Sequence, residues 1–230
     1  MTPTRIAAAL ALAALALAPA VAPGQGGKPP KGPRGTAALG LEIRQPTLVF
    51  GGTVTIDGRL TGVTPDQDVV VRLEADDTKP YGDRYEDTGL TTRTAASGRY
   101  SFTHKPASNT QYRARAQASP PVASDARLVT VRYAVRFGVS DPTPRRGARV
   151  RFRGSVAPAH DGARAVIQRR TSTGSFRTVA RMRLRAAAGD VSRYRRAVRI
   201  RRDGVYRVRV PGDDDHAEGF SRTRRIDAGG

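Results

Sequence analysis

The sequence predicts an all-β protein built from two tandem antiparallel β-sandwich domains. From Leu39 onward the chain consists of short runs of alternating apolar and polar residues, separated by Gly, Pro, Asp and Asn, which is typical of strands at regular spacing. No stretch after the first 20 residues keeps helical periodicity for long. The strand patterns also repeat with a period of about 95 residues, which suits a whole sandwich domain of ~100 residues.

The first 20 residues have the order of parts of a secretory signal peptide. Arg5 supplies a positive charge, residues 6–18 are an almost unbroken run of Ala, Leu and Ile, and Ala18-Pro19-Ala20 is a small-x-small cleavage pattern. An apolar run of 13 residues is too short to cross a bilayer comfortably. We therefore expect residues 1–20 to be cleaved and the product to be exported, without a transmembrane segment; an anchor that is never cleaved is the alternative.

Residues 21–38 are dominated by Pro and Gly and lack apolar periodicity, which predicts a disordered or extended linker. The chain has no Cys, so disulfides, thiolate metal sites and Cys nucleophiles are excluded. An exported protein without disulfides must rest on its hydrophobic cores. Nearly all basic residues are Arg, and Ala and Gly are abundant, which is a bias typical of high-GC actinobacterial genomes.

The repeat is visible in the strand patterns of the two copies. Residues 54–60 (VTIDGRL) match residues 150–156 (VRFRGSV) at an offset of 96. Two tyrosines of the first copy match two of the second at an offset of 94: Tyr100 and Tyr112 with Tyr194 and Tyr206. A difference in loop length between the copies explains the change in offset. We therefore place the first domain at residues 39–132 and the second at residues 133–228.

A turn, a tyrosine and a strand suggest a family. Residues 203–210 (DGVYRVRV) place Tyr206 after an Asp-Gly turn and before an alternating strand, which resembles the tyrosine corner of immunoglobulin-like and fibronectin type III-like domains. Residues 109–112 (NTQY) are a weaker match in the first copy. The strands at residues 149–156, 163–170 and 175–185 resemble the immunoglobulin-like repeats of exported actinobacterial proteins. This resemblance implies spacers, adhesive modules or stalks; the Cys pair and core Trp of antibody domains are missing.

Arginines occupy the outward positions of four strands in the second copy. Successive strand residues point to opposite faces, so the burial of Val150 and Phe152 leaves the arginines between them exposed. The outward set is Arg149, Arg151, Arg153, Arg181, Arg183, Arg185, Arg199, Arg201, Arg207 and Arg209. Residues 40–132 carry 12 basic and 11 acidic residues, whereas residues 133–230 carry 24 and 9. Genome bias acts on both copies alike, so it does not explain this difference alone.

We therefore hypothesise that the second domain binds an anionic polymer, because Arg makes bidentate contacts with phosphate and carboxylate. Outside a bacterial cell the candidates are teichoic acid, acidic polysaccharide and released DNA, and a merely solvated basic face is the alternative. No helix-turn-helix, zinc-finger or RNP motif is present, so we expect no dedicated nucleic-acid binding. The expected location is extracellular, with non-covalent association with the cell wall; another exported protein is a further possible partner.

The sequence shows no catalytic constellation. His104, His160 and His216 are isolated, and neither an HExxH nor a Gly-x-Ser-x-Gly motif occurs. We therefore predict a non-catalytic exported binding or structural module, with the histidines as loop residues. The alternative is a carbohydrate-binding or accessory module of a separate secreted enzyme. Tyr81 and Tyr85 could form a small aromatic platform for it, or they could equally cap the sandwich.

Two acidic clusters are the remaining candidate sites. One follows Pro211-Gly212 and consists of Asp213, Asp214, Asp215 and Glu218. The other lies in a loop of the first copy and consists of Asp76, Asp77, Asp83, Glu86 and Asp87. Clustered carboxylates on loops can hold Ca²⁺, although neither cluster has the spaced Asp-x-Asp-x-Asp-Gly pattern. The later cluster could instead offset neighbouring arginines, and no other cofactor is expected.

Overall fold

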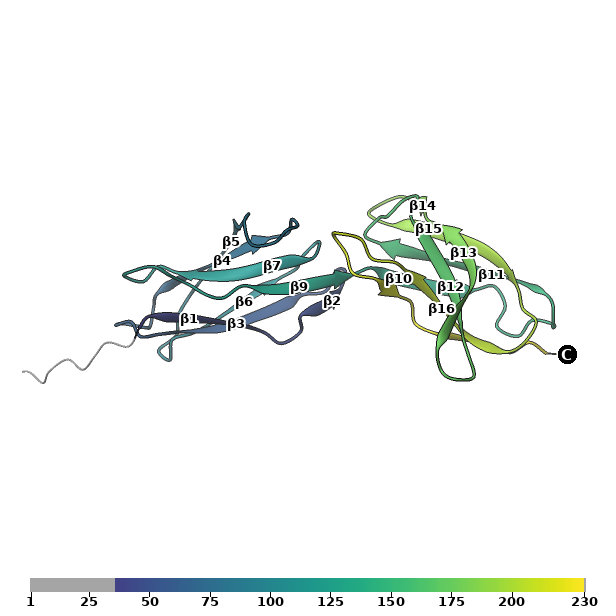
Figure 1. Ribbon diagram of the computed structural model, residues 1–230, viewed down its shortest axis with the longest axis horizontal. Helices are drawn as coiled ribbons and strands as arrows, with labels where there is room; N and C mark the ends of the chain where they lie inside the picture. Colours follow the sequence, from purple (N-terminus) through teal and green to yellow (C-terminus); the bar gives the residue numbers. More distant parts are fainter. Residues whose placement is uncertain (1–35, 230) are drawn as a thin grey trace, which may run out of the picture. The chain divides into compact units, whose positions relative to one another are not determined.

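The computed structural model describes residues 36–229, and the predicted signal peptide and most of the predicted linker lie outside these residues (Figure 1). Every regular element between residues 36 and 229 is a β-strand, so the all-β prediction is confirmed. No helix in this part of the chain is long and apolar enough to cross a membrane.

The first half contains two sheets. One has the strand order β1-β3-β6, and the other has the order β2-β9-β7-β4-β5 with β8 beside β7. All pairings are antiparallel except that of β2 with β9. The strands are β1 (Ala38–Ile43), β2 (Thr47–Val49), β3 (Val54–Thr61), β4 (Val70–Asp76), β5 (Glu86–Arg93), β6 (Arg99–His104), β7 (Thr110–Ala116), β8 (Val122–Ala123) and β9 (Arg127–Arg132).

The second half also contains two sheets. One sheet has the order β10-β11-β15-β14, and the other has the order β13-β12-β16-β17 with β18 beside β16. Strands β11 and β15 are neighbours although three strands separate them along the chain, so the connections cross between sheets. The strands are β10 (Ala134–Val139), β11 (Arg149–Ala157), β12 (Arg164–Arg170), β13 (Phe176–Arg183), β14 (Arg185–Ala186), β15 (Ser192–Arg199), β16 (Gly204–Val210), β17 (Gly219–Phe220) and β18 (Arg224–Ile226).

Alternating apolar residues form two separate hydrophobic cores. Ile56, Leu73 and Tyr112 are fully buried in the first core, and Phe152 and Ile167 are fully buried in the second. Each core draws its buried residues from one of the two predicted domains. The boundary at residues 132 and 133 itself stays a prediction.

The hydroxyl of Tyr206, predicted to form a tyrosine corner, makes no hydrogen bond within residues 36–229. Its ring packs edge-on against Phe152, with the centroids 5.5 Å apart. Tyrosines on β6 and β15 make a hydroxyl-to-backbone bond instead: Tyr100 donates to the Gly40 carbonyl and Tyr194 to the Arg136 carbonyl, each at 2.6 Å. The repeat that relates these tyrosines is therefore real, but the expected corner at Tyr206 is wrong.

Candidate anion-binding face

The outward side of the sheet β10-β11-β15-β14 carries eight arginines and no acidic residue. Val150 and Phe152 of β11 are buried, so the arginines that alternate with them face outward. Residues paired directly across neighbouring strands share a face, and the strand register extends the set to the other three strands. We call this surface the arginine face: Arg136, Arg149, Arg151, Arg153, Arg185, Arg193, Arg195 and Arg199.

The strand register arranges the arginine face in four rows. The first row crosses all four strands as Arg136, Ser155, Arg193 and Arg185. The second row is Gly138, Arg153 and Arg195; the third is Arg151 and Ala197; the fourth is Arg149 and Arg199. Arginines therefore stand directly opposite one another in the first, second and fourth rows.

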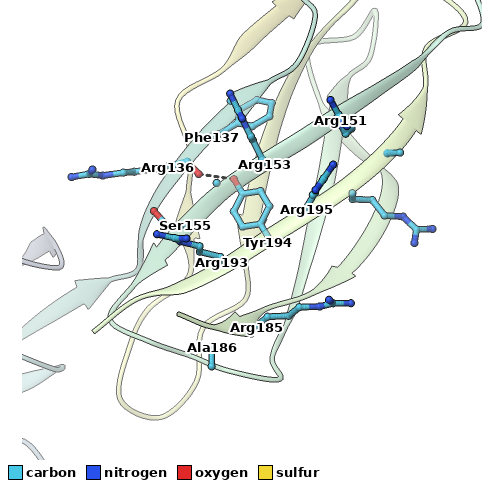
Figure 2. A pocket seen from close by; sticks show the side chains of 14 residues that line it. Arg136, Phe137, Arg151, Arg153, Ser155, Arg185, Ala186, Arg193, Tyr194 and Arg195 are labelled. Carbon is cyan, nitrogen blue, oxygen red and sulfur yellow. Dashed lines mark hydrogen bonds between the residues drawn. The ribbon is translucent and has the colours of Figure 1, made fainter. Parts of the chain in front are cut away.

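An open hollow of about 1150 Å³ lies within this face (Figure 2). Seven of its 14 lining residues are arginines, and none is acidic. Gly138, Ser155 and Ala197 leave space between the longer arginine side chains. The two aromatic residues at the hollow pack within the protein. Tyr194 is 3% exposed, and the Phe137 ring stacks on Phe152 with the centroids 5.4 Å apart. The hollow therefore offers positive charge without a free aromatic ring.

The guanidinium groups of the arginine face make no ion pair and no hydrogen bond to any residue between 36 and 229. Like charges directly opposite across strands destabilise a sheet by a few tenths of a kcal/mol per pair. Salt screens this repulsion in part, and a bound anion would neutralise it. The face therefore has the charge and the free donors that a multivalent anion requires.

Five of the ten predicted arginines lie outside this face. Arg181 and Arg183 belong to β13, Arg207 and Arg209 to β16, and Arg201 follows β15. The Arg207 guanidinium lies 3.8 Å from the ring centroid of Phe176 and 4.2 Å from that of Phe220.

Internal partners also occupy several of these arginines. Arg207 donates to Gln168 Oε1 at 2.8 Å, and burial lowers its pKa. Arg209 pairs with Glu218 at 2.6 Å, and Arg183 donates to a backbone carbonyl at 2.9 Å. The predicted arginines therefore lie on two different sheets. On the second sheet, Arg183, Arg207 and Arg209 already have partners within the protein.

Sequence reasoning missed three members of the face: Arg136, Arg193 and Arg195. Arg193 and Arg195 flank the buried Tyr194, so strand alternation could have identified them. Arg136 lies between two half-buried apolar residues of an edge strand, where alternation is a weaker signal.

The matching surface of the first half is mixed in charge. On the sheet β1-β3-β6, Glu42 stands directly opposite Asp57. The hollow there has a volume of about 730 Å³ and is lined by both acidic and basic residues. Arg44 lies 3.8 Å from the Asp57 carboxylate. The absence of acidic residues from the corresponding hollow is therefore particular to the second half.

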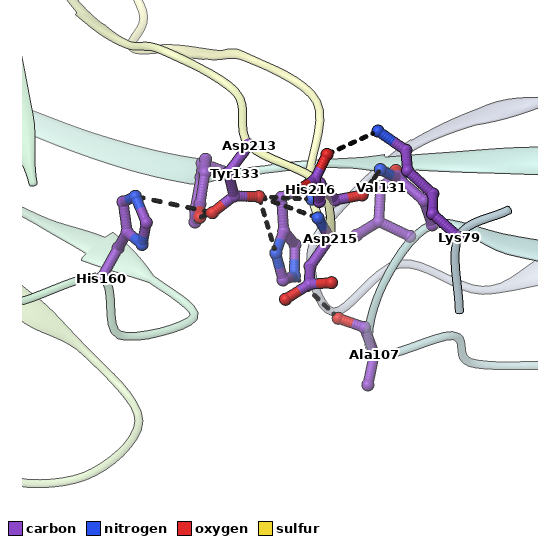
Figure 3. A network of polar contacts seen from close by, with 10 residues as sticks. Lys79, Ala107, Val131, Tyr133, His160, Asp213, Asp215 and His216 are labelled. Carbon is purple, nitrogen blue, oxygen red and sulfur yellow. Dashed lines mark hydrogen bonds and ion pairs between the residues drawn. The ribbon is translucent and has the colours of Figure 1, made fainter. Parts of the chain in front are cut away.

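The carboxylates of the calcium site predicted near residue 213 contact different groups, and Figure 3 shows the network around Asp213. Asp213 accepts hydrogen bonds from the Tyr133 hydroxyl at 2.5 Å and from the His216 amide at 2.7 Å. Asp214 pairs with Lys79 at 3.0 Å, whereas Glu218 pairs with an arginine. Within the described part of the chain, no group of three or more His, Asp or Glu side chains is placed to hold a metal ion. The calcium site therefore remains a prediction without geometric support.

The segment around Asp213 also joins the two halves of the described chain, which belong to one compact unit. His216 Nε2 lies 2.9 Å from the Ala107 carbonyl, and the His216 ring stacks on Tyr133 at 4.9 Å (Figure 3). His160 packs against Tyr133 as well, at 5.0 Å. Burial raises the pKa of the Asp213 carboxyl, but the Tyr133 hydroxyl and the His216 amide outweigh this effect, so its pKa lies below the ordinary value.

All three histidines make contacts within the described chain. His160 and His216 lie in loops, as predicted, but His104 lies at the end of β6, where the loop prediction is wrong. His104 Nδ1 lies 2.7 Å from the Tyr112 hydroxyl, and burial lowers its pKa.

The predicted carbohydrate platform is partly covered. The Tyr85 hydroxyl donates to Gln111 Oε1 at 2.6 Å, and the Arg113 guanidinium lies 3.9 Å from the centre of the Tyr85 ring. Tyr81 and Tyr85 are both half-buried, and burial raises the pKa of each. One face of the Tyr85 ring is therefore already occupied.

No protein-family model and no curated protein matches this chain. Among solved structures, it is similar to the tetra-tandem repeat in the extending region of a large adhesion protein, with 15% sequence identity and a TM-score of 0.35. The similarity covers 84% of this chain and 50% of that one, so this chain spans about half its length. A likeness this distant identifies no ligand or activity.

Proposed function

We propose that this protein is a non-catalytic, exported binding module whose arginine face binds an anionic polymer of the cell envelope or its surroundings. The observation that carries the proposal is the set of eight unpaired arginines on one sheet face that has no acidic residue. Such a surface is destabilising by itself and becomes favourable when an anion neutralises it. Guanidinium groups stay protonated and bind phosphate and carboxylate in bidentate fashion.

The strand order supports an immunoglobulin-like sandwich as the scaffold. If β10 to β17 are taken as strands A, B, C, C′, D, E, F and G, the two sheets become A-B-E-D and C′-C-F-G. The first of these is the A-B-E-D sheet of immunoglobulin-like domains. The arginine face is then the solvent side of a sheet supported by a packed core, so the positions of its arginines are set by a rigid element.

Binding fits the chemistry of the face better than catalysis does. An arginine cannot act as a general base at neutral pH because its guanidinium does not lose its proton. The face holds no acidic residue and no histidine that could transfer a proton. Its groups can hold and orient an anion but cannot activate a nucleophile.

The predicted export restricts the partner to polymers outside the cell. Teichoic acid, acidic polysaccharide and released DNA all carry the repeated negative charge that the face requires. The repetition of charge matters because several weak contacts on one chain act together. We propose that this contact provides a non-covalent association with the cell wall.

Retention on immobilised heparin and on purified cell-wall polymer tests the proposal. The test variant replaces Arg149, Arg153, Arg195 and Arg199 with Gln, and a matched control replaces Arg44, Arg59, Arg93 and Arg99, which line the hollow of the first half. Both variants lose four positive charges. We expect the test variant to elute at much lower salt and the control to elute near the parent protein. Equal loss in both variants would show an effect of net charge alone and would contradict the proposed site.

A further inference from the structure

We infer that the bound polymer is an extended chain with phosphate groups in its backbone, which lies along strands β11 and β15 and spans all four rows of the arginine face. This inference rests on the proposed function and specifies the course, length and charge chemistry of the ligand.

The four rows of the arginine face follow one another along the strands at a regular spacing. Successive outward residues of one strand lie about 6.8 Å apart, and neighbouring strands lie about 4.8 Å apart. The rows are marked on β15 by residues 193, 195, 197 and 199. They therefore cover about 20 Å along the strands, and each row has an arginine on β11 or β15.

A polymer that follows the strands meets more arginines than one that crosses them. A chain along the strands meets six arginines on β11 and β15: Arg149, Arg151, Arg153, Arg193, Arg195 and Arg199. A chain across the strands meets three in the first row and at most two in any other. Since each neutralised charge adds to the electrostatic free energy of binding, the course along the strands is favoured. Arg136 and Arg185 lie on the outer strands, beside this track.

Two rows place an arginine of β11 directly opposite an arginine of β15. Arg153 stands opposite Arg195, and Arg149 stands opposite Arg199. Side chains paired in this way start from Cβ atoms about 5 Å apart, so two guanidinium groups can converge on one phosphate. Each group offers a planar set of donors that fits two phosphate oxygens. A phosphate at each pair would remove the repulsion within that row.

The arginine face offers a ligand charge but no free aromatic ring. Tyr194 faces the core, and Phe137 is stacked on Phe152, so the face has no ring on which a base could stack. It also lacks the exposed aromatic platform expected of a carbohydrate module. Recognition must then rely on charge alone. A flexible chain with charges in its own backbone can bring them close to the strands, whereas bulky rings between the charges would hold them away.

Inorganic polyphosphate of graded length, measured by titration calorimetry, tests this inference. We expect long-chain polyphosphate to bind with a slope of log K against log salt of about −4, because six neutralised charges contribute about −0.7 each. Tripolyphosphate is too short to reach from the first row to the fourth, so we expect it to bind at least about 100-fold more weakly, with a shallower slope.

Two double variants test the course of the chain. Arg149→Gln with Arg199→Gln removes the fourth row, and Arg136→Gln with Arg185→Gln removes the same charge from the outer strands. We expect the first variant to weaken the binding of long-chain polyphosphate about tenfold, and the second to weaken it only about threefold because Arg136 and Arg185 lie beside the track. All four side chains are exposed, so neither variant should melt below the parent protein, and loss of the Arg149–Arg199 repulsion should raise the melting temperature slightly.

The binding of polyphosphate and heparin tests the proposed function, and the two double variants test the course of the polymer. If neither polyphosphate nor heparin binds at any length, the proposed function itself is overturned. If both bind but the two double variants lose affinity equally, the polymer does not follow β11 and β15, and only the inferred course fails. If heparin of equal length binds more tightly than polyphosphate, the assignment to backbone phosphate is overturned.

Discussion

The Tyr194 hydroxyl on β15 donates a 2.6 Å hydrogen bond to the Arg136 carbonyl on β10, across the intervening strand β11. The tyrosine passes over Gly154, where a Cβ atom would lie only 2.6 Å from Tyr194 Cζ. This tie holds together, from the core side, three of the strands that carry the arginine face. Tyr100, Gly58 and Gly40 form the same arrangement in the first half.

Replacement of Gly154 by Ala should destabilise the protein. The new Cβ would meet the Arg136 carbonyl oxygen and Tyr194, and relief of this overlap should cost about 1–3 kcal/mol. Gly138→Ala on the neighbouring strand is the matched control, because its Cβ would lie 3.9 Å from the nearest carbonyl oxygen. Chemical denaturation of both variants measures the difference. Equal stability of the two would contradict the close approach described here.

Replacement of Tyr194 by Phe removes only the hydroxyl and leaves the packing of the ring. The lost hydrogen bond to Arg136 should cost about 1 kcal/mol. Tyr100→Phe should have a similar effect through Gly40, because the same bond is made there. The two sites lie in separate cores, so their effects on the free energy of unfolding should add in the double variant. A neutral result at either site would show that the bond contributes nothing there.

The Asp76 carboxylate should make the stability of the protein depend on pH. Its carboxylate accepts backbone hydrogen bonds from Thr78 at 3.1 Å, Gly82 at 2.6 Å and Arg84 at 3.2 Å. Burial raises the pKa of Asp76, but these bonds outweigh it and leave the pKa below its ordinary value. A lowered folded-state pKa stabilises the protein above the unfolded-state pKa, and this stability is lost as the pH falls through the folded-state value.

Asp76→Asn is therefore expected to be less stable than the parent at neutral pH. The gap should narrow as the pH falls below about 4, because the parent then loses its own carboxylate bonds. Denaturant midpoints over a pH series measure the gap, with the exposed Asp83→Asn as the control in the same loop. A gap that stays constant with pH would contradict the assigned role of the Asp76 charge.

Arg207 should contribute to stability, whereas Arg151 should contribute to polymer binding. Arg207→Ala removes a guanidinium from between Phe176 and Phe220 and should lower stability by about 1–2 kcal/mol. Polyphosphate binding should then stay near that of the parent. Arg151→Gln should leave the melting temperature unchanged and weaken binding. Melting temperature and polyphosphate affinity are measured for both variants. Lost affinity in Arg207→Ala, or lost stability in Arg151→Gln, would contradict the assignment of binding to one sheet and packing to the other.

Several features could be predicted from the sequence because they depend on local alternation. The burial of Val150 and Phe152 and the exposure of the arginines around them follow from the two-residue period of a strand. The repeat of Gly58 and Tyr100 as Gly154 and Tyr194 could be seen in the sequence as a spacing. The hydrogen bond from each tyrosine could not be predicted, because the accepting carbonyl lies about 60 residues away in the chain, on a strand whose register no local pattern specifies.

The sequence by itself determined that the described chain is all-β and which side is polar in strands with clear alternation, such as β11. Only the tertiary structure decided which strands are neighbours. Alternation places Arg149 and Arg209 on outward positions alike, but it does not say that β11 joins β15 while β16 joins β12. Sheet membership depends on crossover connections, and these are decided by the packing of whole sheets. Those connections bring Arg193 and Arg195 into line with Arg149 and leave Arg209 paired with Glu218 on the other sheet.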